Sequence, residues 1–386
     1  MLFYSYYSVE ELTVKKILNY IVVSIFFVIF IVATAGCAQL NDFSWNLKQF
    51  DEQVSFHTDL QREYLNDNYL TVLNYASGNK ELSKPKAVVL EWELFENGNM
   101  IENVAYYVLS VSEYETLRYA TQYETTEKSY DVYNLKIATR YYWRVEAYFA
   151  DGKCVRSQTV DFQTADEKIR NLNIDGITNV RDVGGWDIRN GRVKQGMLFR
   201  CGRLNKSGSS TVKIEITDQG KYDMINVLGI RTEIDLRNVE NNEVGSITES
   251  PLGNTVSYYQ FPLDWSVTDL LMGNAEVVKR IFDLLGDESR YPMIFHCDIG
   301  TDRTGMIAYL INGLLGVGED DLYRDYLFSN FGKIGGNRTL AYIVNNYVAT
   351  IKAAEGDNLS EKIENCLLGI GVSQDTIDTV RKIMTA

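Results

Sequence analysis

The sequence predicts two folded domains of different class, an all-β domain followed by an α/β domain. Between Pro85 and Thr164, apolar residues recur at every second position, which is the spacing of a β-strand with one buried face. Beyond residue 172, short apolar runs alternate with segments in which apolar residues return every three or four positions, as in a parallel sheet with intervening helices. A chain of 386 residues has room for both domains and a targeting segment.

The composition of the chain limits which partners and cofactors we expect it to bind. The hydrophobic content of 45% and the presence of only four prolines favour well-cored domains over disorder. A formal net charge of −14 argues against nucleic acid as a partner, because such a partner needs a basic face. The five cysteines are widely scattered and there are only two histidines, so we expect no metal, no other cofactor and no disulfide framework. Three of the cysteines are predicted to be buried structural thiols: Cys154, Cys201 and Cys366.

Residues 1–37 have the pattern of an export signal. Two lysines precede an apolar run that ends in ATAGC, and this ending resembles the lipobox of bacterial lipoproteins. The resemblance implies a lipid on Cys37, although Thr34 stands where the lipobox usually has leucine. An uncleaved anchor is the alternative, because the run is nearly long enough to span a bilayer. Both hypotheses place residues 38–386 at the outer face of a bacterial cell membrane, tethered to it.

The next two regions are predicted to be a spacer and a β-sandwich. Residues 38–83 are polar and aromatic and end in a turn-rich stretch, so we expect a spacer with some structure of its own there, with His57 incidental. Residues 84–166 contain several short strands separated by turn sequences, which indicates a sandwich. In RYYWRVEAYF, one face of the strand carries Tyr141, Trp143, Val145, Ala147 and Phe149.

The sandwich resembles a fibronectin type III domain. The resemblance rests on Trp92 in LEWEL and on LKIATRYYWRVEA, which contains Tyr141. In that family the tryptophan lies in the core, and a tyrosine in this position closes a strand corner. Ile137 and Ala138 stand where proline or glycine is common. The resemblance implies a role as a spacer or, less commonly, in partner binding.

Residues 172–386 are predicted to form the α/β domain. TEIDLRN and YPMIFHC are typical of buried parallel strands. Between them, Asn274 can cap a helix whose apolar face consists of Val277, Val278, Ile281, Phe282 and Leu285. A second such face consists of Met306, Ile307, Leu310, Ile311 and Leu314. Ligands of such folds bind beyond the carboxyl ends of the strands, and HCDIGTDRTG lies there, between a strand and a helix.

This loop, residues 296–305, is predicted to bind an anion. A loop that enters a helix directs successive backbone N–H groups to one point, and here they belong to Asp298, Ile299, Gly300 and Thr301. Gly300 allows the tight turn, and Arg303 can bind two oxygens of one phosphate.

The same loop carries a candidate nucleophile. Cys297 stands at its head, where the N–H dipoles favour the thiolate. His296 can hold the geometry of the loop, and Thr304 can offer its hydroxyl to the sulfur.

The arrangement of Cys297, five residues and Arg303 is that of protein tyrosine phosphatases. The loop resembles that of the bacterial secreted tyrosine phosphatases, which reads His-Cys-x-x-Gly-Lys-Asp-Arg-Thr-Gly. NVRDVGGW, GMLFRCGRL and LGIRTEIDLRNVEN resemble further blocks of this family, over about residues 172–386. The resemblance implies that Cys297 is the nucleophile, Arg303 binds phosphate and Asp302 is the general acid. Asp264 in FPLDWS is the second candidate acid.

Other polar residues of these blocks have structural interpretations. Asp182 and Asp235 are expected to tie loops near the site by hydrogen bonds, and the Gly184–Gly185 pair to form a turn. Three arginines can serve either the site or internal salt bridges: Arg200, Arg203 and Arg237.

The expected activity is metal-free hydrolysis of phosphotyrosine monoesters through a cysteinyl-phosphate intermediate. Thr301 replaces the lysine that the family associates with phosphoinositides, and Asp298 adds a negative charge, so a multiply phosphorylated lipid is the less favoured substrate. Two alternatives stay open. One is an inositol phosphate or phosphoinositide phosphatase of the same chemistry, and the other is a surface binding protein with a vestigial phosphatase domain.

Overall fold

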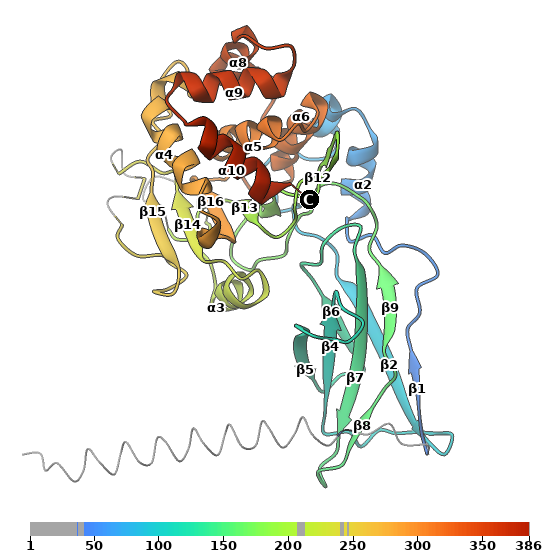
Figure 1. The fold of residues 1–386 in the computed structure, drawn as a ribbon. Helices are drawn as coiled ribbons and strands as arrows, with labels where there is room; N and C mark the ends of the chain where they lie inside the picture. The colour runs from blue at the N-terminus through green and yellow to red at the C-terminus, as the bar shows by residue number, and fades with distance from the viewer. Residues whose placement is uncertain (1–36, 38–41, 207–212, 240–242, 245–246, 386) are drawn as a thin grey trace, which may run out of the picture. The chain divides into compact units, whose positions relative to one another are not determined.

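The structure is a computed structural model that describes residues 37, 42–206, 213–239, 243–244 and 247–385 (Figure 1). The predicted export signal at residues 1–36 lies outside the described residues. Within the described ranges, no helix is long and apolar enough to cross a bilayer. The chain forms two compact units. The β unit comprises the described parts of Met1–Asp51, Val89–Tyr130 and Arg140–Phe162, and the α/β unit comprises Glu52–Val88, Asp131–Thr139 and the described parts of Gln163–Ala386.

The β unit consists of two sheets, which agrees with the predicted all-β domain. One sheet contains β1 (Phe43–Leu47), β2 (Val88–Glu96), β3 (Asn99–Met100) and β6 (Ser129–Val132). The other contains β4 (Tyr106–Ser112), β5 (Thr121–Thr125), β7 (Arg140–Tyr148), β8 (Cys154–Arg156) and β9 (Val160–Gln163). The sheets share a core in which the rings of Trp92 and Tyr107 pack edge to face at 5.6 Å. The predicted inward face of β7 is buried, except that Phe149 is only half-buried.

The segment at 38–83 has structure of its own, as expected, but in the described residues its two parts belong to the two folded units and form no separate spacer. Residues 43–47 are strand β1, which pairs antiparallel with β2 from Phe43↔Glu96 to Leu47↔Trp92. Residues 52–88 belong to the α/β unit and include α2 (Asp59–Asn66) and the short helix η1 (Tyr69–Asn74). The backbone N–H groups of Gly78 and Leu82 donate to the carbonyls of Asn330 and Phe331 at 2.7 and 2.6 Å.

A disulfide between Cys37 and Cys154 corrects the prediction made for Cys154 and bears on the one made for Cys37. Cys154 is not a free buried thiol, because its sulfur is bonded to that of Cys37. The same bond occupies the sulfur that a lipid thioether on Cys37 would need, so the lipidated form and the form in this structure exclude one another. Of the free cysteines, Cys201 is buried as predicted, whereas Cys366 is only half-buried.

The sheet of the α/β unit has the order β10-β13-β16-β14-β15. Its strands are β10 (Arg181–Asp182), β13 (Leu198–Cys201), β16 (Met293–His296), β14 (Thr232–Asp235) and β15 (Ser257–Gln260). The last four pair in parallel and only β10 is antiparallel, which confirms the predicted parallel sheet. A small hairpin, β11 (Asp187–Ile188) and β12 (Gly191–Arg192), lies apart from this sheet.

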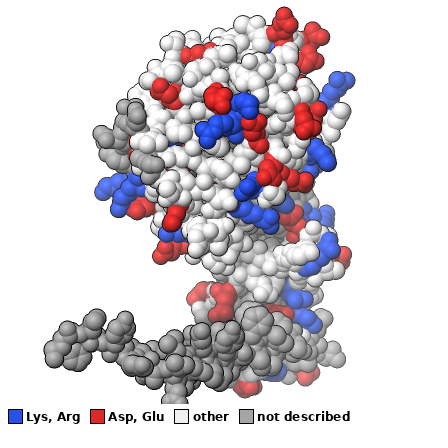
Figure 2. All heavy atoms as spheres, turned by 60° about the vertical axis from the view of Figure 1, so that its left-hand side comes forward, with Lys and Arg blue, Asp and Glu red and all other residues white. Residues whose placement is uncertain are grey.

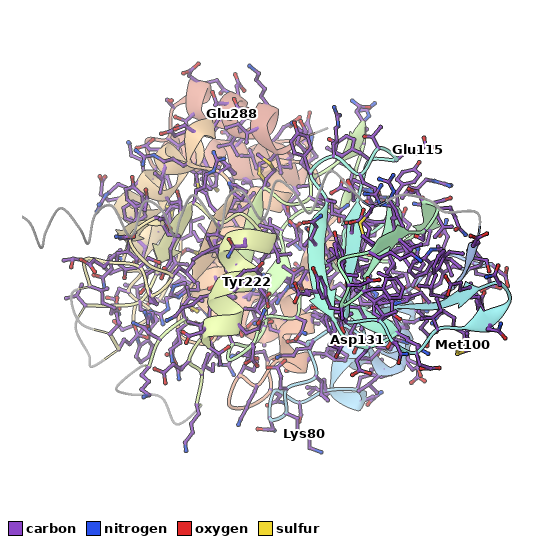
Figure 3. The ribbon with its side chains drawn as sticks, turned by 90° about the horizontal axis from the view of Figure 1, so that it is seen from below. Lys80, Met100, Glu115, Asp131, Tyr222 and Glu288 are labelled. Carbon is purple, nitrogen blue, oxygen red and sulfur yellow. A yellow bond between two sulfur atoms is a disulfide. The ribbon has the colours of Figure 1, made fainter. Side chains whose placement is uncertain are left out.

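Helices cover both faces of this sheet (Figure 1). The larger core lies beneath α4 (Ala275–Leu285), α5 (Asp302–Leu314), α6 (Glu319–Phe328), α9 (Leu359–Gly369) and α10 (Gln374–Met384). The smaller core lies beneath α3 (Asp218–Tyr222) and η2 (Asp223–Val227). Tyr222, labelled in Figure 3, ends α3 with 55% of its surface exposed. The remaining helical segments are η3 (Met272–Asn274), η4 (Glu288–Arg290), η5 (Ser329–Phe331), α7 (Leu340–Ile343), η6 (Val344–Val348) and α8 (Ala349–Ala353).

The predicted apolar faces of α4 and α5 are buried, apart from half-buried Val277. Asn274 precedes α4 but makes no side-chain cap. Its amide instead donates to the carbonyls of Asp264 and Leu270 at 3.0 and 2.9 Å, and it accepts from the N–H of Asp264 at 2.7 Å. Asn274 therefore fixes the loop that carries Asp264. On the face shown in Figure 2, basic and acidic side chains are intermixed.

Candidate active site

The loop from Cys297 to Thr301 connects β16 to α5, as the sequence predicts. Gly300 has a φ of +71°, and a Cβ at this position would lie 2.3 Å from the carbonyl oxygen of Cys201. Only glycine satisfies both the left-handed backbone and the close approach of the neighbouring strand.

The carbonyl groups of this loop point outward to donors of the surrounding protein. The oxygen of Asp298 accepts from the N–H of Arg203 at 3.1 Å, and that of Gly300 accepts from Arg200 Nη2 and Asn179 Nδ2, both at 2.9 Å. Among the described residues, the backbone N–H groups of residues 298–303 have no acceptor. Consecutive unpaired N–H groups at a helix N-terminus form a binding site for an anion.

The side chain of Cys297 is 2% exposed at the head of this loop. The Thr304 hydroxyl is fully buried, and it has no hydrogen-bond partner within the described part of the chain. The predicted hydrogen bond from Thr304 to the sulfur of Cys297 is therefore not formed in this structure.

Glu243 orients Arg303 and was not predicted from the sequence. Its Oε2 accepts from Arg303 Nη1 at 2.8 Å and its Oε1 from Nη2 at 2.5 Å. Nη1 also donates to the carbonyls of Leu236 and Leu263 at 3.3 and 3.5 Å. The Nε–H and one N–H of Nη2 have no acceptor among the described residues, so one side of the guanidinium fork can bind two oxygens of a phosphate.

A buried framework holds the outer side of the loop. Asp325 accepts from Arg181 Nε at 2.7 Å and from Arg200 Nη1 at 2.6 Å. Arg181 also donates to the side chain of Asn179, which in turn donates to Gly300. Burial raises the pKa of the Asp325 carboxyl, but the two guanidinium groups outweigh burial and hold this pKa below its usual value.

The sequence left open whether Arg203 and Arg237 serve the site or internal salt bridges. Both form internal salt bridges in the structure. Arg203 Nη1 donates to Asp298 Oδ1 at 2.9 Å, so the charge of Asp298 is paired. This pairing weakens the argument that Asp298 repels a multiply charged substrate. The side chain of Thr301 is buried against Asn179, so only its backbone N–H can line the anion site.

Asp182 and Asp235 have structural roles, as expected. Asp182 accepts from the N–H groups of Gly184 and Gly196 at 2.8 and 2.6 Å and from Arg170. None of these three partners belongs to the loop from Cys297 to Thr301. Gly184 and Gly185 form a turn in which Gly185 has a φ of +97°. Asp235 forms a two-oxygen ion pair with Arg237 directly beneath His296.

A cluster beneath the loop also has the composition of a metal site. Candidate ligand atoms of Glu233, Asp235 and His296 lie within 4.8 Å of one another. Each of these residues already has hydrogen-bond partners, so the cluster is a complete network without an ion.

The two candidate acids differ in their surroundings. Asp302, in the first turn of α5, accepts from Tyr326 Oη at 2.9 Å and from Arg338 Nε at 3.1 Å. Asp264 accepts from both the hydroxyl and the N–H of Ser266, at 2.7 and 2.9 Å. These hydrogen bonds, with the positive charge of Arg303, lower the pKa of the Asp264 carboxyl.

Tyr342, in α7, is a second residue that the sequence did not predict for the site. Burial raises the pKa of its hydroxyl to about 12, with contributions from the negative charges of Asp302 and Cys297. No motif pointed to Tyr342, and only its electrostatic coupling to these two groups in the folded chain identifies it.

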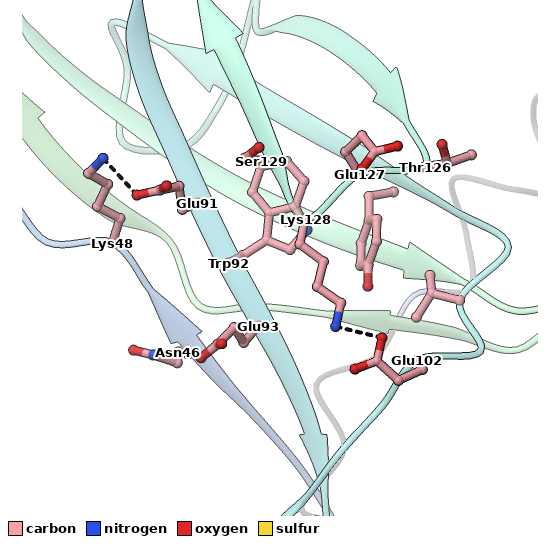
Figure 4. Close-up of a pocket in the computed structure, with 12 residues that line it drawn as sticks. Asn46, Lys48, Glu91, Trp92, Glu93, Glu102, Thr126, Glu127, Lys128 and Ser129 are labelled. Atoms are coloured by element: carbon pink, nitrogen blue, oxygen red, sulfur yellow. Dashed lines mark hydrogen bonds and ion pairs between the residues drawn. The ribbon is translucent and has the colours of Figure 1, made fainter.

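The β unit contains a pocket of about 780 Å³, and half of the residues that line it are charged (Figure 4). It is lined by Trp92 and by two ion pairs, Lys48–Glu91 at 2.7 Å and Lys128–Glu102 at 2.9 Å. Cysteine and histidine are absent from its described walls, so the nucleophilic chemistry identified here belongs to the α/β unit.

Comparison with known proteins agrees with this site. Residues 172–385 match the model of a family described as the tyrosine phosphatase family. The chain belongs to this family. The matched region includes the Cys297 loop, Arg303 and the arginine framework, whereas no comparison tests the fibronectin type III resemblance of the β unit, which stays a prediction.

Among individual proteins, the chain is 30% identical over 184 residues to a Cupriavidus necator protein named as a candidate tyrosine-protein phosphatase. The match covers 41% of this phosphatase-family chain and 63% of the relative. A solved structure of the core catalytic domain of the PP-IP phosphatase SIW14 from S. cerevisiae, in complex with citrate, is 15% identical. It covers 41% of this chain and 86% of that domain with a TM-score of 0.27, which is too low to support an argument.

Proposed function

We propose that the protein is a cysteine-dependent phosphomonoester hydrolase that acts on phosphotyrosine. The observation that carries this proposal is the loop itself. Cys297 stands at its head, residues 298–303 offer unpaired N–H groups, and Arg303 presents the free side of its guanidinium.

The reaction has two steps. The thiolate of Cys297 attacks phosphorus, the bond from phosphorus to the tyrosyl oxygen breaks, and the acid protonates that oxygen. The loop N–H groups and Arg303 stabilise the charge on the phosphoryl oxygens. Water then attacks the cysteinyl phosphate and gives its proton to the carboxylate, which releases phosphate and restores the thiolate.

Phosphotyrosine is favoured over multiply phosphorylated substrates because position 301 lacks a cationic side chain. Thr301 is buried, and Arg203, which contacts the loop at Asp298, is paired with that carboxylate. A second or third phosphate would therefore find little unpaired positive charge at this part of the loop.

A substrate panel tests this preference. We expect phosphate release from phosphotyrosine peptides to exceed release from inositol phosphates and phosphoinositides by at least about tenfold in kcat/KM, since one unpaired charge contact is worth about 1.5–3 kcal/mol. Phosphate release is measured with chelator present. The rate of the Cys297→Ser variant, which lacks the nucleophile, serves as the background. Preference for the inositol-based substrates would contradict the assignment of phosphotyrosine.

The general acid can be identified from leaving-group dependence. We propose Asp302, because it lies in the helical turn that also carries Arg303. Asp302→Asn should lower kcat/KM for phosphotyrosine by about 10²-fold or more, but hardly affect p-nitrophenyl phosphate, whose leaving group needs no proton.

Asp264→Asn is the matched comparison for this experiment. If Asp302 is the acid, Asp264→Asn lowers kcat/KM by a similar factor for phosphotyrosine and for p-nitrophenyl phosphate, and this factor is smaller than the loss in Asp302→Asn for phosphotyrosine. If Asp264→Asn alone shows the leaving-group dependence, Asp264 is the acid and the role of Asp302 is to bind Arg338.

We further propose that the protein works outside the cytoplasm, tethered to the membrane. The Cys37–Cys154 disulfide supports this location, because such bonds persist in oxidising compartments. The disulfide favours the uncleaved apolar anchor over a lipid on Cys37, and mass spectrometry of the mature N-terminus tests this choice.

A further inference from the structure

Residues 52–88 belong to the α/β unit, although they lie outside residues 172–385, which match the tyrosine phosphatase family. Ser83, near the end of this segment, is 2% exposed. Its carbonyl accepts from Asn171 Nδ2 at 2.7 Å, and its N–H and hydroxyl both donate to Glu81 Oε1, at 3.0 and 2.5 Å. Because the hydroxyl proton is directed to Glu81, the hydroxyl oxygen of Ser83 is free to accept a hydrogen bond from another donor.

This donor is the backbone N–H of Asn179, which lies 3.2 Å from the hydroxyl oxygen of Ser83. Asn179 is 1% exposed and has a φ of +60°, a left-handed conformation that is uncommon for residues other than glycine. Such a conformation persists where the surrounding structure holds it, and the hydrogen bond from Asn179 to Ser83 is one of the contacts that do so. Without Ser83, this buried N–H would lose its acceptor, which is costly.

The side chain of Asn179 extends to the anion-binding loop. Its Nδ2 donates to the carbonyl oxygens of Gly300 and Ile299 at 2.9 and 3.3 Å. In a planar trans peptide the C=O and N–H groups point in opposite directions. By binding these two carbonyls, Asn179 therefore also fixes the directions of the next two N–H groups, which belong to Thr301 and Gly300.

We infer that Ser83 is a positioning residue for the anion-binding loop and that it acts through Asn179. It holds the left-handed backbone of Asn179, and this backbone aims the amide at the two loop carbonyls. Ser83 does not touch the substrate. The inference rests on the proposed function, in which the loop N–H groups bind the phosphoryl oxygens. Residues 52–88 are thus part of the catalytic unit, although the sequence places most of the β unit between them and the loop.

The arginines of the buried framework do not replace Ser83. Arg181 donates to the side-chain oxygen of Asn179, and Arg200 donates to the carbonyl of Gly300 at 2.9 Å. A guanidinium group has donors but no acceptor, so neither arginine can bind the backbone N–H of Asn179.

The affinity of the intact protein for inorganic phosphate, measured by isothermal titration calorimetry, tests this role. In Ser83→Ala we expect the Kd for phosphate to rise about tenfold, because a buried N–H loses its acceptor and the loop loses its support. Ser83→Cys keeps the size of the side chain but offers only a weak acceptor, so it should shift the Kd in the same direction even if Ser83→Ala folds poorly. An unchanged Kd in Ser83→Cys, or in a folded Ser83→Ala, would overturn the inference.

A double-mutant cycle tests whether Ser83 acts through Asn179. Asn179→Gly removes the amide and still permits the left-handed backbone. In this background, Ser83→Ala should cause no further rise in the Kd for phosphate, since the route to the loop is already interrupted. If the two losses multiply instead, Ser83 does not act through Asn179.

Val72→Ala is the matched control. Val72 is a core residue of the same segment, 2% exposed in η1, and it takes no part in the hydrogen bonds from Ser83 to the loop. It should lower the melting temperature but leave the Kd for phosphate unchanged. An equal loss of affinity in Val72→Ala would show that any loosening of the segment weakens the site, which would contradict a specific role for Ser83.

Phosphate binding requires no turnover, so this inference and the proposed function can fail separately. An unmodified protein that binds phosphate but does not hydrolyse p-nitrophenyl phosphate would contradict the proposed function. The Kd values of the variants would still decide the role of Ser83.

Discussion

Arg303→Lys is expected to lower kcat/KM for a phosphomonoester by about 10³-fold or more, with the fold retained. Arg303 presents two parallel N–H groups to the anion site while Glu243 binds the opposite side of the guanidinium. A lysine keeps the charge but offers a single ammonium that cannot bind Glu243 and two phosphate oxygens in this geometry. Steady-state kinetics with p-nitrophenyl phosphate, beside a thermal melt, measure the effect.

Glu243→Gln is the matched comparison, since it leaves the guanidinium in place and removes only the charge that orients it. We expect a smaller loss, about 10- to 100-fold. Near-complete activity in Arg303→Lys would show that Arg303 does not stabilise the transition state.

Asp325→Asn is expected to lower the free energy of unfolding by about 3–5 kcal/mol at neutral pH. Asp325 is the shared carboxylate of Arg181 and Arg200, and both arginines are about 1% exposed. Its removal leaves two buried positive charges without their counter-ion. It also releases the arginine that holds the carbonyl of Gly300, so activity should fall as well. Urea unfolding followed by circular dichroism measures the change.

The contribution of Asp325 to the free energy of unfolding should decrease as the pH falls. The pKa of Asp325 is lower in the folded protein than in the unfolded chain, so its contribution is fully present above the unfolded value of about 3.9. The contribution is lost as the pH falls through the folded value, so the unmodified protein and Asp325→Asn should converge in acid. Asp378→Asn, at an exposed ion pair with Arg381, is the control and should change stability by no more than about 1 kcal/mol. Equal destabilisation by both variants would contradict the role given to Asp325.

Local sequence patterns predicted strands in the β unit, and the parallel sheet and helices of the α/β unit. The alternation in β7 and the helical spacing in α4 and α5 correspond to buried faces in the structure. The segment from 52 to 88 was misassigned because its apolar residues pack against parts of the α/β unit that lie far along the chain. The disulfide was missed for a related reason, since Cys37 and Cys154 are separated by 117 positions.

At the site, sequence identified the residues of the loop but not those that orient them. Cys297, Gly300 and Arg303 are contiguous in a recognisable spacing, so their chemistry could be predicted. Glu243 lies 60 positions before Arg303, in a segment without a motif, and only the folded chain brings it to the guanidinium. The roles of Ser83 and Tyr342 likewise depend on tertiary contacts.

The central claim is that phosphate is transferred to Cys297, and rapid-quench trapping of the intermediate tests it most directly. The protein is mixed with a phosphotyrosine peptide, quenched in acid within the first turnover and mapped by mass spectrometry. The account predicts one added phosphoryl group on the peptide that contains Cys297, and no such adduct in Cys297→Ser. Continued turnover without this adduct, or an equal rate of hydrolysis by Cys297→Ser, would contradict it.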